Sequence, residues 1–146
     1  TIWSLFRTKA GAMFLGTHQG LTEYQGGRWT LVPETSRRTF YAMTEDPKGG
    51  FWAGGTKPPR IENNALLHRP VGGSFQSVPL LSIKNTVGCL VSASDGSFWL
   101  GTQAEGLHHG HRTAKGVESA RVALPRESPR EGSNYPARSS RPGEAA

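Results

Sequence analysis

A short pattern of glycines and aromatic residues occurs three times in the chain, and it constrains the fold more than any other feature. Each copy has a turn glycine, an aromatic residue three positions later and a second glycine two positions after that. The copies are Gly11-Phe14-Gly16, Gly49-Trp52-Gly54 and Gly96-Trp99-Gly101, and Thr17 and Thr102 follow the first and third. All three landmarks are spaced by 38 and then by 47 residues. Periods of this length are typical of repeat architectures.

Each copy also has the same order of apolar runs and turns. An apolar run precedes the turn at residues 2–6, 39–44 and 87–92. The run at 39–44 alternates at period two, which predicts a strand with Phe40, Ala42 and Thr44 on one side and Tyr41 and Met43 on the other. A second short strand follows each turn, so each copy predicts a hairpin. The first copy continues with two further strand-like runs, at 20–24 and 29–33, which makes four antiparallel strands in about forty residues.

The repeated residues have a physical role in such a fold. A four-stranded sheet that is apolar on both faces needs a neighbour on each side, and a large aromatic residue fills the space between two sheets. The following glycine allows a neighbouring backbone to approach closely, and the threonine hydroxyl bonds locally to the strand end. We therefore predict an all-β fold, a partial β-propeller of about three four-stranded antiparallel blades. The expected blades are 1–36, 37–84 and an incomplete 85–112, followed by a disordered tail at 113–146 rich in Pro, Arg and Ser.

Charge and composition exclude several classes. The net charge is +6, but the basic residues are scattered, whereas a nucleic-acid interface needs a basic patch. No run approaches the roughly 20 apolar residues of a membrane span, and the sequence predicts no signal peptide in this chain. The chain has one cysteine, Cys89, which excludes an intramolecular disulfide. Its apolar neighbours predict a buried, unreactive thiol.

The fuller pattern resembles the two-component regulator propeller repeat. Residues 94–107, SDGSFWLGTQAEGL, are closest to it; residues 10–21 have Phe14 in place of tryptophan, and residues 44–55 lack the threonine after Gly54. The resemblance implies the sensor propeller of a bacterial hybrid histidine kinase, in an extracytoplasmic or periplasmic location. It also implies a non-enzymatic piece of about three blades that binds a carbohydrate or other small ligand. The kinase itself would lie in a longer protein, outside this chain.

The candidate ligand-binding residues lie in the extra length of the second copy, at 55–73. Loops on one face of a propeller commonly carry binding. The candidates are Arg60, Asn63, Asn64 and His68. We expect no catalytic residue, cofactor or metal site: His108, His109 and His111 alternate along a strand without further ligands, and Glu45 and Asp46 form a solvated turn.

Two alternatives remain open. One is a propeller lyase that resembles the streptogramin-inactivating type, with a divalent metal held by His18 or His109 and Glu105. The other is a repeat module that docks another protein. In every case three blades are too few to close a ring of four to eight, so we expect the remaining blades or self-association to cover the two ends.

Overall fold

The computed structural model describes residues 1–56 and 65–125, and nearly all of its regular structure is β-strand. Three separate sheets each contain four strands. Blade 1 contains β1 (Ile2–Arg7), β2 (Met13–Thr17), β3 (Gly20–Gln25) and β4 (Arg28–Leu31). Blade 2 contains β5 (Thr39–Glu45), β6 (Phe51–Thr56), β7 (Ala65–Arg69) and β8 (Gln76–Pro79). Blade 3 contains β9 (Val87–Ser92), β10 (Phe98–Thr102), β11 (Leu107–Thr113) and β12 (Gly116–Arg121).

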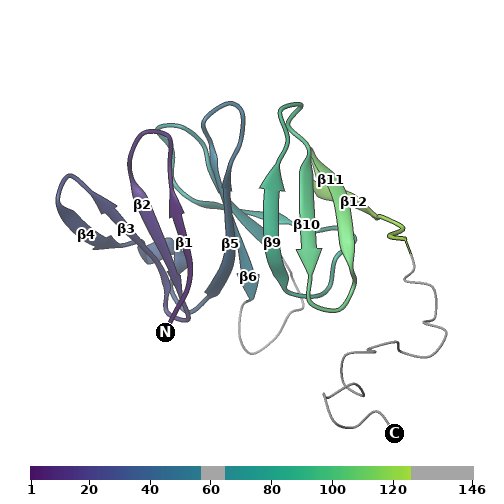
Figure 1. The fold of residues 1–146 in the computed structure, drawn as a ribbon. Coiled ribbons are helices and arrows are strands. Elements are labelled where there is room, and N and C mark those ends of the chain that lie inside the picture. Colours follow the sequence, from purple (N-terminus) through teal and green to yellow (C-terminus); the bar gives the residue numbers. More distant parts are fainter. Residues whose placement is uncertain (57–64, 126–146) are drawn as a thin grey trace, which may run out of the picture.

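Within every blade the strands pair in chain order and antiparallel, and the three sheets stand side by side in sequence order (Figure 1). A single 3-10 turn, Pro33–Thr35, joins blade 1 to blade 2. In the part of the chain that the structure describes, no helix is long and apolar enough to cross a bilayer. The predicted all-β partial propeller is confirmed.

The third blade is complete, so the prediction that it ends unfinished at residue 112 is wrong. β12 pairs with β11 from Gly116 to Arg121, and Val117 is fully buried. Leu81 of the connection from blade 2 donates its backbone N–H to Val117 O at 3.0 Å. These tertiary contacts hold a strand whose own sequence, GVESAR, has little apolar periodicity. Of the predicted tail, residues 126–146 lie outside the described residues.

The three first hairpins share one turn geometry. In each turn, the backbone N–H of the first residue donates to the carbonyl oxygen of the residue four positions later. The carbonyl oxygen of the first residue accepts from the backbone N–H of the glycine three positions later. The first residues are Thr8, Asp46 and Ala93, and the glycines are Gly11, Gly49 and Gly96 with φ between 86° and 93°. This left-handed conformation is the reason for glycine at that position of the repeat.

The predicted side-chain alternation in β5 is wrong at Phe40. The register with β6 shifts between Phe40 and Ala42, so Tyr41 is an extra, bulged residue, and β1 and β9 have the same irregularity at the equivalent positions. A bulge moves the residues before it to the opposite face of the sheet. Phe40 therefore packs toward blade 1, while Ala42 packs toward blade 3.

Each blade has a leading face toward the preceding blade and a trailing face toward the following one. Phe14 and Trp52 lie on trailing faces, and Phe51 and Phe98 lie on leading faces. Phe14 stacks on Phe51 with ring centroids 4.3 Å apart, and Trp52 meets the ring of Phe98 edge-on at 4.7 Å. The predicted role of the repeat aromatic, which is to fill the space between sheets, is confirmed at Phe14 and Trp52.

Trp99 is the exception, because within residues 1–56 and 65–125 no other blade packs on its trailing face. Trp99 is 39% exposed, whereas Trp52 is 2% exposed. Cys89 lies on the same open face and is also exposed, so the prediction of a buried thiol is wrong. The sequence context is apolar, but Cys89 lies on the sheet face that no other described blade covers.

The other repeat residues act as expected. Thr17 Oγ1 donates to Gly20 O at 3.1 Å, and Thr102 Oγ1 donates to Gly106 O at 2.7 Å, so both hydroxyls hold the strand end. At Gly16 a Cβ would lie 2.5 Å from Phe40 O in blade 2, and at Gly54 it would lie 3.2 Å from Val87 Cγ1 in blade 3. Glycine thus permits the close approach of the next blade.

A candidate binding groove between blades 2 and 3

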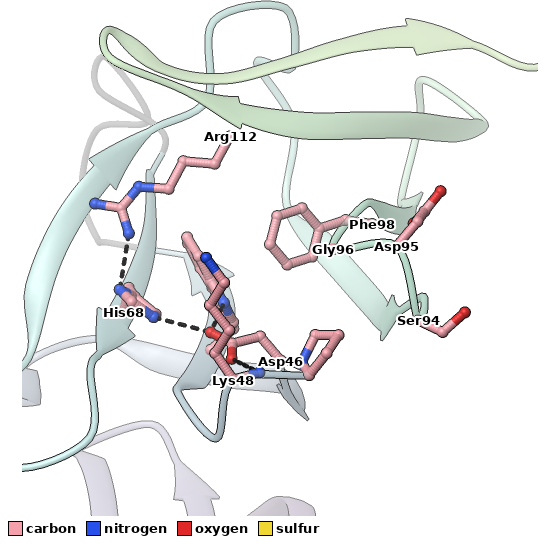
Figure 2. A pocket seen from close by; sticks show the side chains of 10 residues that line it. Asp46, Lys48, His68, Ser94, Asp95, Gly96, Phe98 and Arg112 are labelled. Atoms are coloured by element: carbon pink, nitrogen blue, oxygen red, sulfur yellow. Dashed lines mark hydrogen bonds and ion pairs between the residues drawn. The ribbon is translucent and has the colours of Figure 1, made fainter.

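A groove of about 340 Å³ opens between blades 2 and 3, at the end where their first hairpins turn. We call it groove 2–3. Blade 2 supplies the turn at Asp46, Pro47 and Lys48 together with Trp52 and His68. Blade 3 supplies the turn at Ser94, Asp95 and Gly96 together with Phe98 and Arg112. Figure 2 shows Asp46 and His68 facing Phe98 and Arg112 across one space, while the side chains of Ser94 and Asp95 point away from it.

Asp46 organises the blade 2 side of the groove. Its Oδ1 accepts the backbone N–H groups of Lys48 at 2.8 Å and Gly50 at 2.9 Å. Its Oδ2 accepts the Trp52 indole N–H at 3.3 Å and contacts His68 Nε2 at 3.2 Å. The predicted solvated turn is therefore half correct: Asp46 does build the turn, but it also binds two ring side chains of neighbouring strands.

His68 is held between a carboxylate and a cation. Arg112 lies across the junction, and its guanidinium NH1 donates to His68 Nδ1 at 2.9 Å (Figure 2). Because a guanidinium can only donate, Nδ1 is the unprotonated nitrogen and Nε2–H donates to Asp46. Both ring nitrogens are thus engaged, and the ring is a neutral, fixed tautomer.

The electrostatics agree with that assignment. Burial lowers the pKa of His68, the hydrogen bond to Asp46 offsets this only in part, and the charge of Arg112 lowers the pKa further. Burial alone would raise the pKa of the Asp46 carboxyl. The hydrogen bonds from Gly50, His68, Lys48 and Trp52 outweigh that effect and hold this pKa below its ordinary value. The groove therefore has a carboxylate and a neutral imidazole inside, with two cations around them.

Aromatic rings form the floor of groove 2–3. The His68 ring stacks on Trp52 with centroids 4.1 Å apart and planes at 27°, and the Arg112 guanidinium lies 5.4 Å from the Trp52 ring. Trp52 and Phe98 are almost fully buried, so they support the polar groups and leave little ring surface for a ligand. Hydrogen-bonding groups therefore face the open groove, and buried aromatic rings lie beneath them.

The structure places one of the four predicted ligand-binding residues in this groove. His68 lies in it, while Arg60, Asn63 and Asn64 lie outside the described residues. Asp46, Lys48 and Arg112 were not predicted as binding residues. The spacing of the repeat could have identified Asp46 and Lys48, because the hairpin turns are equivalent in the three copies. It could not have identified Arg112, which is 44 positions from His68 and meets it only through the packing of blade 2 on blade 3.

The residues considered as metal ligands do not lie together. His109 Nε2 bonds to Ser97 Oγ at 3.0 Å, whereas Glu105 Oε1 accepts from Asn85 Nδ2 at 2.8 Å and from the Lys84 N–H at 3.0 Å. His108 turns inward and its Nδ1 contacts Ser119 Oγ at 3.1 Å. Within residues 1–56 and 65–125, no three His, Cys, Asp or Glu side chains are placed to hold one ion.

A related groove lies one blade earlier. Between blades 1 and 2 the turns at Thr8 and Gly49 frame a space of about 570 Å³ that contains Glu23 and Arg69. Arg69 of blade 2 binds Glu23 of blade 1 at 3.2 Å and covers the Phe14 ring at 5.0 Å. In both grooves a residue on the third strand of one blade thus receives an arginine from the next. Glu23 replaces His68 in the earlier groove, so the two grooves differ in charge.

Comparisons with known proteins support the fold alone. No family model matches the chain, and no curated protein matches it by sequence. Among solved structures, the extracellular domain of a proposed one-component or hybrid two-component system from B. thetaiotaomicron superposes with a TM-score of 0.63 at 22% identity. That match covers 84% of this chain and 16% of the other.

Two enzyme-type structures superpose equally well. A protein proposed to be a gluconolactonase has a TM-score of 0.64 at 14% identity, over 83% of this chain and 49% of its own. Virginiamycin B lyase from Staphylococcus aureus, in complex with quinupristin, has a TM-score of 0.61 at 16% identity, over 85% of this chain and 42% of its own. This chain spans less than half of each of these proteins. It has a propeller-type fold that occurs in sensors and in enzymes alike.

Proposed function

We propose that this protein is a non-enzymatic sensor module that binds a small extracytoplasmic ligand in groove 2–3. Carbohydrate is the first ligand class to test. The observation that carries the proposal is the chain of contacts Asp46–His68–Arg112, which crosses the junction between two blades and opens on a groove of small-molecule size. The likeness to an extracellular sensor domain supports the location and the role.

The geometry favours binding over catalysis. A general base needs a free nitrogen within reach of the proton that it removes. His68 has both nitrogens occupied by fixed partners, and Asp46 accepts four hydrogen bonds. Lys48 and Arg112 can instead donate to ligand oxygens.

A ligand in this groove would be recognised by both blades at once. Because Arg112 belongs to blade 3 and its partner His68 to blade 2, a ligand that bonds to Arg112 changes the contact between the sheets. A sensor needs such a difference in contacts between its free and bound states.

The test is isothermal titration calorimetry with a panel of neutral and uronic-acid oligosaccharides. Arg112→Gln and Lys48→Gln should each weaken binding at least about ten-fold, or roughly 1.4 kcal/mol. Arg121→Gln makes the same charge change at the far end of β12 and should leave affinity unchanged. Absence of binding across the panel, or full binding by Arg112→Gln, would refute the proposal.

A propeller lyase is the second candidate, favoured by the superposition on virginiamycin B lyase. It requires a divalent ion, and the proposed ligands His109 and Glu105 have separate partners here. Titration with Mg²⁺ and Zn²⁺, followed by an assay for opening of quinupristin, separates the two functions. A protein-docking module is the third candidate, and for it the exposed apolar residues Val91 and Trp99 on the trailing face of blade 3 would be the contact surface.

A further inference from the structure

Groove 2–3 and the groove between blades 1 and 2 share one plan and differ at one position of the third strand. His68 pairs with Trp52, and Glu23 pairs with Phe14, so strand register makes His68 and Glu23 equivalent. Each of them receives an arginine from the following blade. Four-stranded sheets form both walls of each groove, so the two grooves can be compared directly.

In the groove between blades 1 and 2, the charge of the arginine is compensated. Arg69 NH1 and NH2 donate to the two carboxylate oxygens of Glu23 at 3.2 and 3.4 Å. The guanidinium also lies 5.0 Å from the Phe14 ring and 5.1 Å from the Phe75 ring. A two-point ion pair against aromatic rings fixes the guanidinium and cancels its charge. Arg69 is therefore a structural link between two blades.

In groove 2–3 the arginine keeps its charge. Within the described part of the chain, the Arg112 guanidinium makes one hydrogen bond, from NH1 to the neutral Nδ1 of His68 at 2.9 Å. No described carboxylate forms an ion pair with Arg112. The remaining guanidinium N–H groups are donors without a charged partner, and a carboxylate is the acceptor that best matches their planar arrangement.

A second cation lines the same groove. Lys48 is exposed in the hairpin turn, and its ammonium group pairs with no carboxylate of the described residues. Asp46 already accepts four hydrogen bonds. Asp95 accepts two from Ser97, and its side chain points away from the groove (Figure 2). The side-chain charges that remain for a ligand are therefore both positive.

We propose that groove 2–3 selects a ligand that carries a carboxylate, and that His68 takes up one proton from solvent as this ligand binds. The inference rests on the proposed function of the groove and adds the charge class of the carbohydrate, which is a sugar acid. Arg112 and Lys48 donate to the carboxylate oxygens. The neutral residue at position 68 is the specificity determinant, because a carboxylate at this position compensates the arginine in the other groove.

The proton uptake follows from the contacts of the imidazole ring. Nε2–H of His68 donates to Asp46, so Nδ1 is the nitrogen that can still bind a proton, and Arg112 faces it. The charged side chains that line the groove around the ring are Asp46, Lys48, Asp95 and Arg112. A ligand carboxylate compensates Arg112, whose charge is one of the causes that lower the pKa of His68, so binding raises this pKa. The imidazolium then lies between Asp46 and the ligand anion.

Calorimetry with matched ligands tests the charge class. Galacturonic and glucuronic acid oligosaccharides are compared with their methyl esters, which have the same ring and lack the charge. The acid should bind at least about ten-fold more tightly than its ester, and added salt should reduce this difference. Binding of the ester or of a neutral oligosaccharide as tightly as the acid would overturn the inference and leave the proposed function standing. Absence of binding by every ligand would refute both.

Proton counting tests the role of His68. Titrations at about pH 6.5, in buffers that differ in ionisation enthalpy, should show uptake of a fraction of a proton per bound acid. Affinity for the acid should rise as the pH falls from about 7.5 to 5.5. In His68→Gln the side chain cannot titrate but can still donate to Asp46, so the acid should bind without proton uptake. Uptake that persists in this variant, or an affinity of the wild type that does not change with pH, would overturn the assignment.

A third experiment transfers the arrangement of the other groove into this one. His68→Glu places a carboxylate next to Arg112, as Glu23 is placed next to Arg69, and should abolish the preference for the acid over the ester. Arg112→Gln removes the charge without adding a carboxylate and should have the same effect. Glu23→Gln is the control in the other groove and should leave the preference unchanged. Circular dichroism checks that each variant is folded, and a full preference in folded Arg112→Gln or His68→Glu would overturn the proposal.

Discussion

Arg112 in blade 3 and His68 in blade 2 are joined by a 2.9 Å hydrogen bond across the junction between two sheets. The bond requires an unprotonated Nδ1, so the imidazole is neutral in the folded state. Protonation of His68 would break the contact and place two cations side by side.

The first prediction is a loss of stability on mild acidification. Burial lowers the folded-state pKa of His68 below its ordinary 6.5, so near that pH the unfolded chain binds a proton that the folded chain does not. Stability therefore falls as pH drops through about 6.5 and continues to fall down to the lower folded-state pKa. Urea denaturation between about pH 7.5 and 5 measures this. His68→Gln should have a shallower slope over this range, and an equal slope in the variant would contradict the assignment.

The second prediction concerns Asp46. Asp46→Ala removes the acceptor of two backbone N–H groups and of the Trp52 indole, and should lower the free energy of unfolding by about 2–3 kcal/mol. Asp95→Ala is the matched control on the next turn, because Asp95 is exposed and accepts hydrogen bonds from the N–H and hydroxyl of Ser97. The measurement is urea denaturation at one protein concentration. Equal effects of the two substitutions would show that Asp46 contributes no more than an exposed turn residue.

The third prediction concerns the close approach at Gly16. A Cβ there would lie 2.5 Å from Phe40 O, which is backbone of the next blade and cannot rotate away. Gly16→Ala should cost about 1–3 kcal/mol through a forced separation of blades 1 and 2. Gly88→Ala is the control, since its nearest neighbour would be Gly101 O at 3.9 Å. Thermal denaturation compares the two, and a Gly16→Ala protein as stable as the control would refute the packing argument.

The fourth prediction concerns the aromatic stack between blades 1 and 2. Phe14 is fully buried and stacks on Phe51 at 4.3 Å, so Phe14→Ala should cost about 3–5 kcal/mol. Val71→Ala, at a residue 74% exposed, should change stability by less than about 0.5 kcal/mol. Chemical denaturation monitored by tryptophan fluorescence gives both values. A loss below about 1 kcal/mol at Phe14 would mean that the two blades do not share a core.

The repeat pattern predicted the blades because glycine turns and inter-sheet aromatics are local requirements of each unit. It located Trp52 and Phe14 correctly, but it did not indicate that Trp99 is partly exposed, since the exposure of a side chain depends on the neighbouring sheet. The bulge at Tyr41 reversed the side assigned to Phe40, because alternation alone contains no information about an inserted residue. β12 was missed because its stability comes from Leu81 and β11 rather than from its own sequence.

The candidate site was less predictable for the same reason. His68 was proposed from its place in a longer repeat, and the groove contains it. Its partners Asp46 and Arg112 come from another strand and another blade, and their roles follow from strand register and blade packing. Strand register and blade packing cannot be read from the sequence of a single repeat.

Each groove has a hairpin turn from both of its blades, an imidazole or carboxylate from the first blade and an arginine from the second. The residues of one groove therefore extend from the first hairpin of one blade to the third strand of the next blade. If the protein gained or lost a whole blade, an existing hairpin would face the arginine position of a different following blade. This exchange would change the recognition surface of the groove in one step. The turn and the stacked rings of the retained blade would stay as they are.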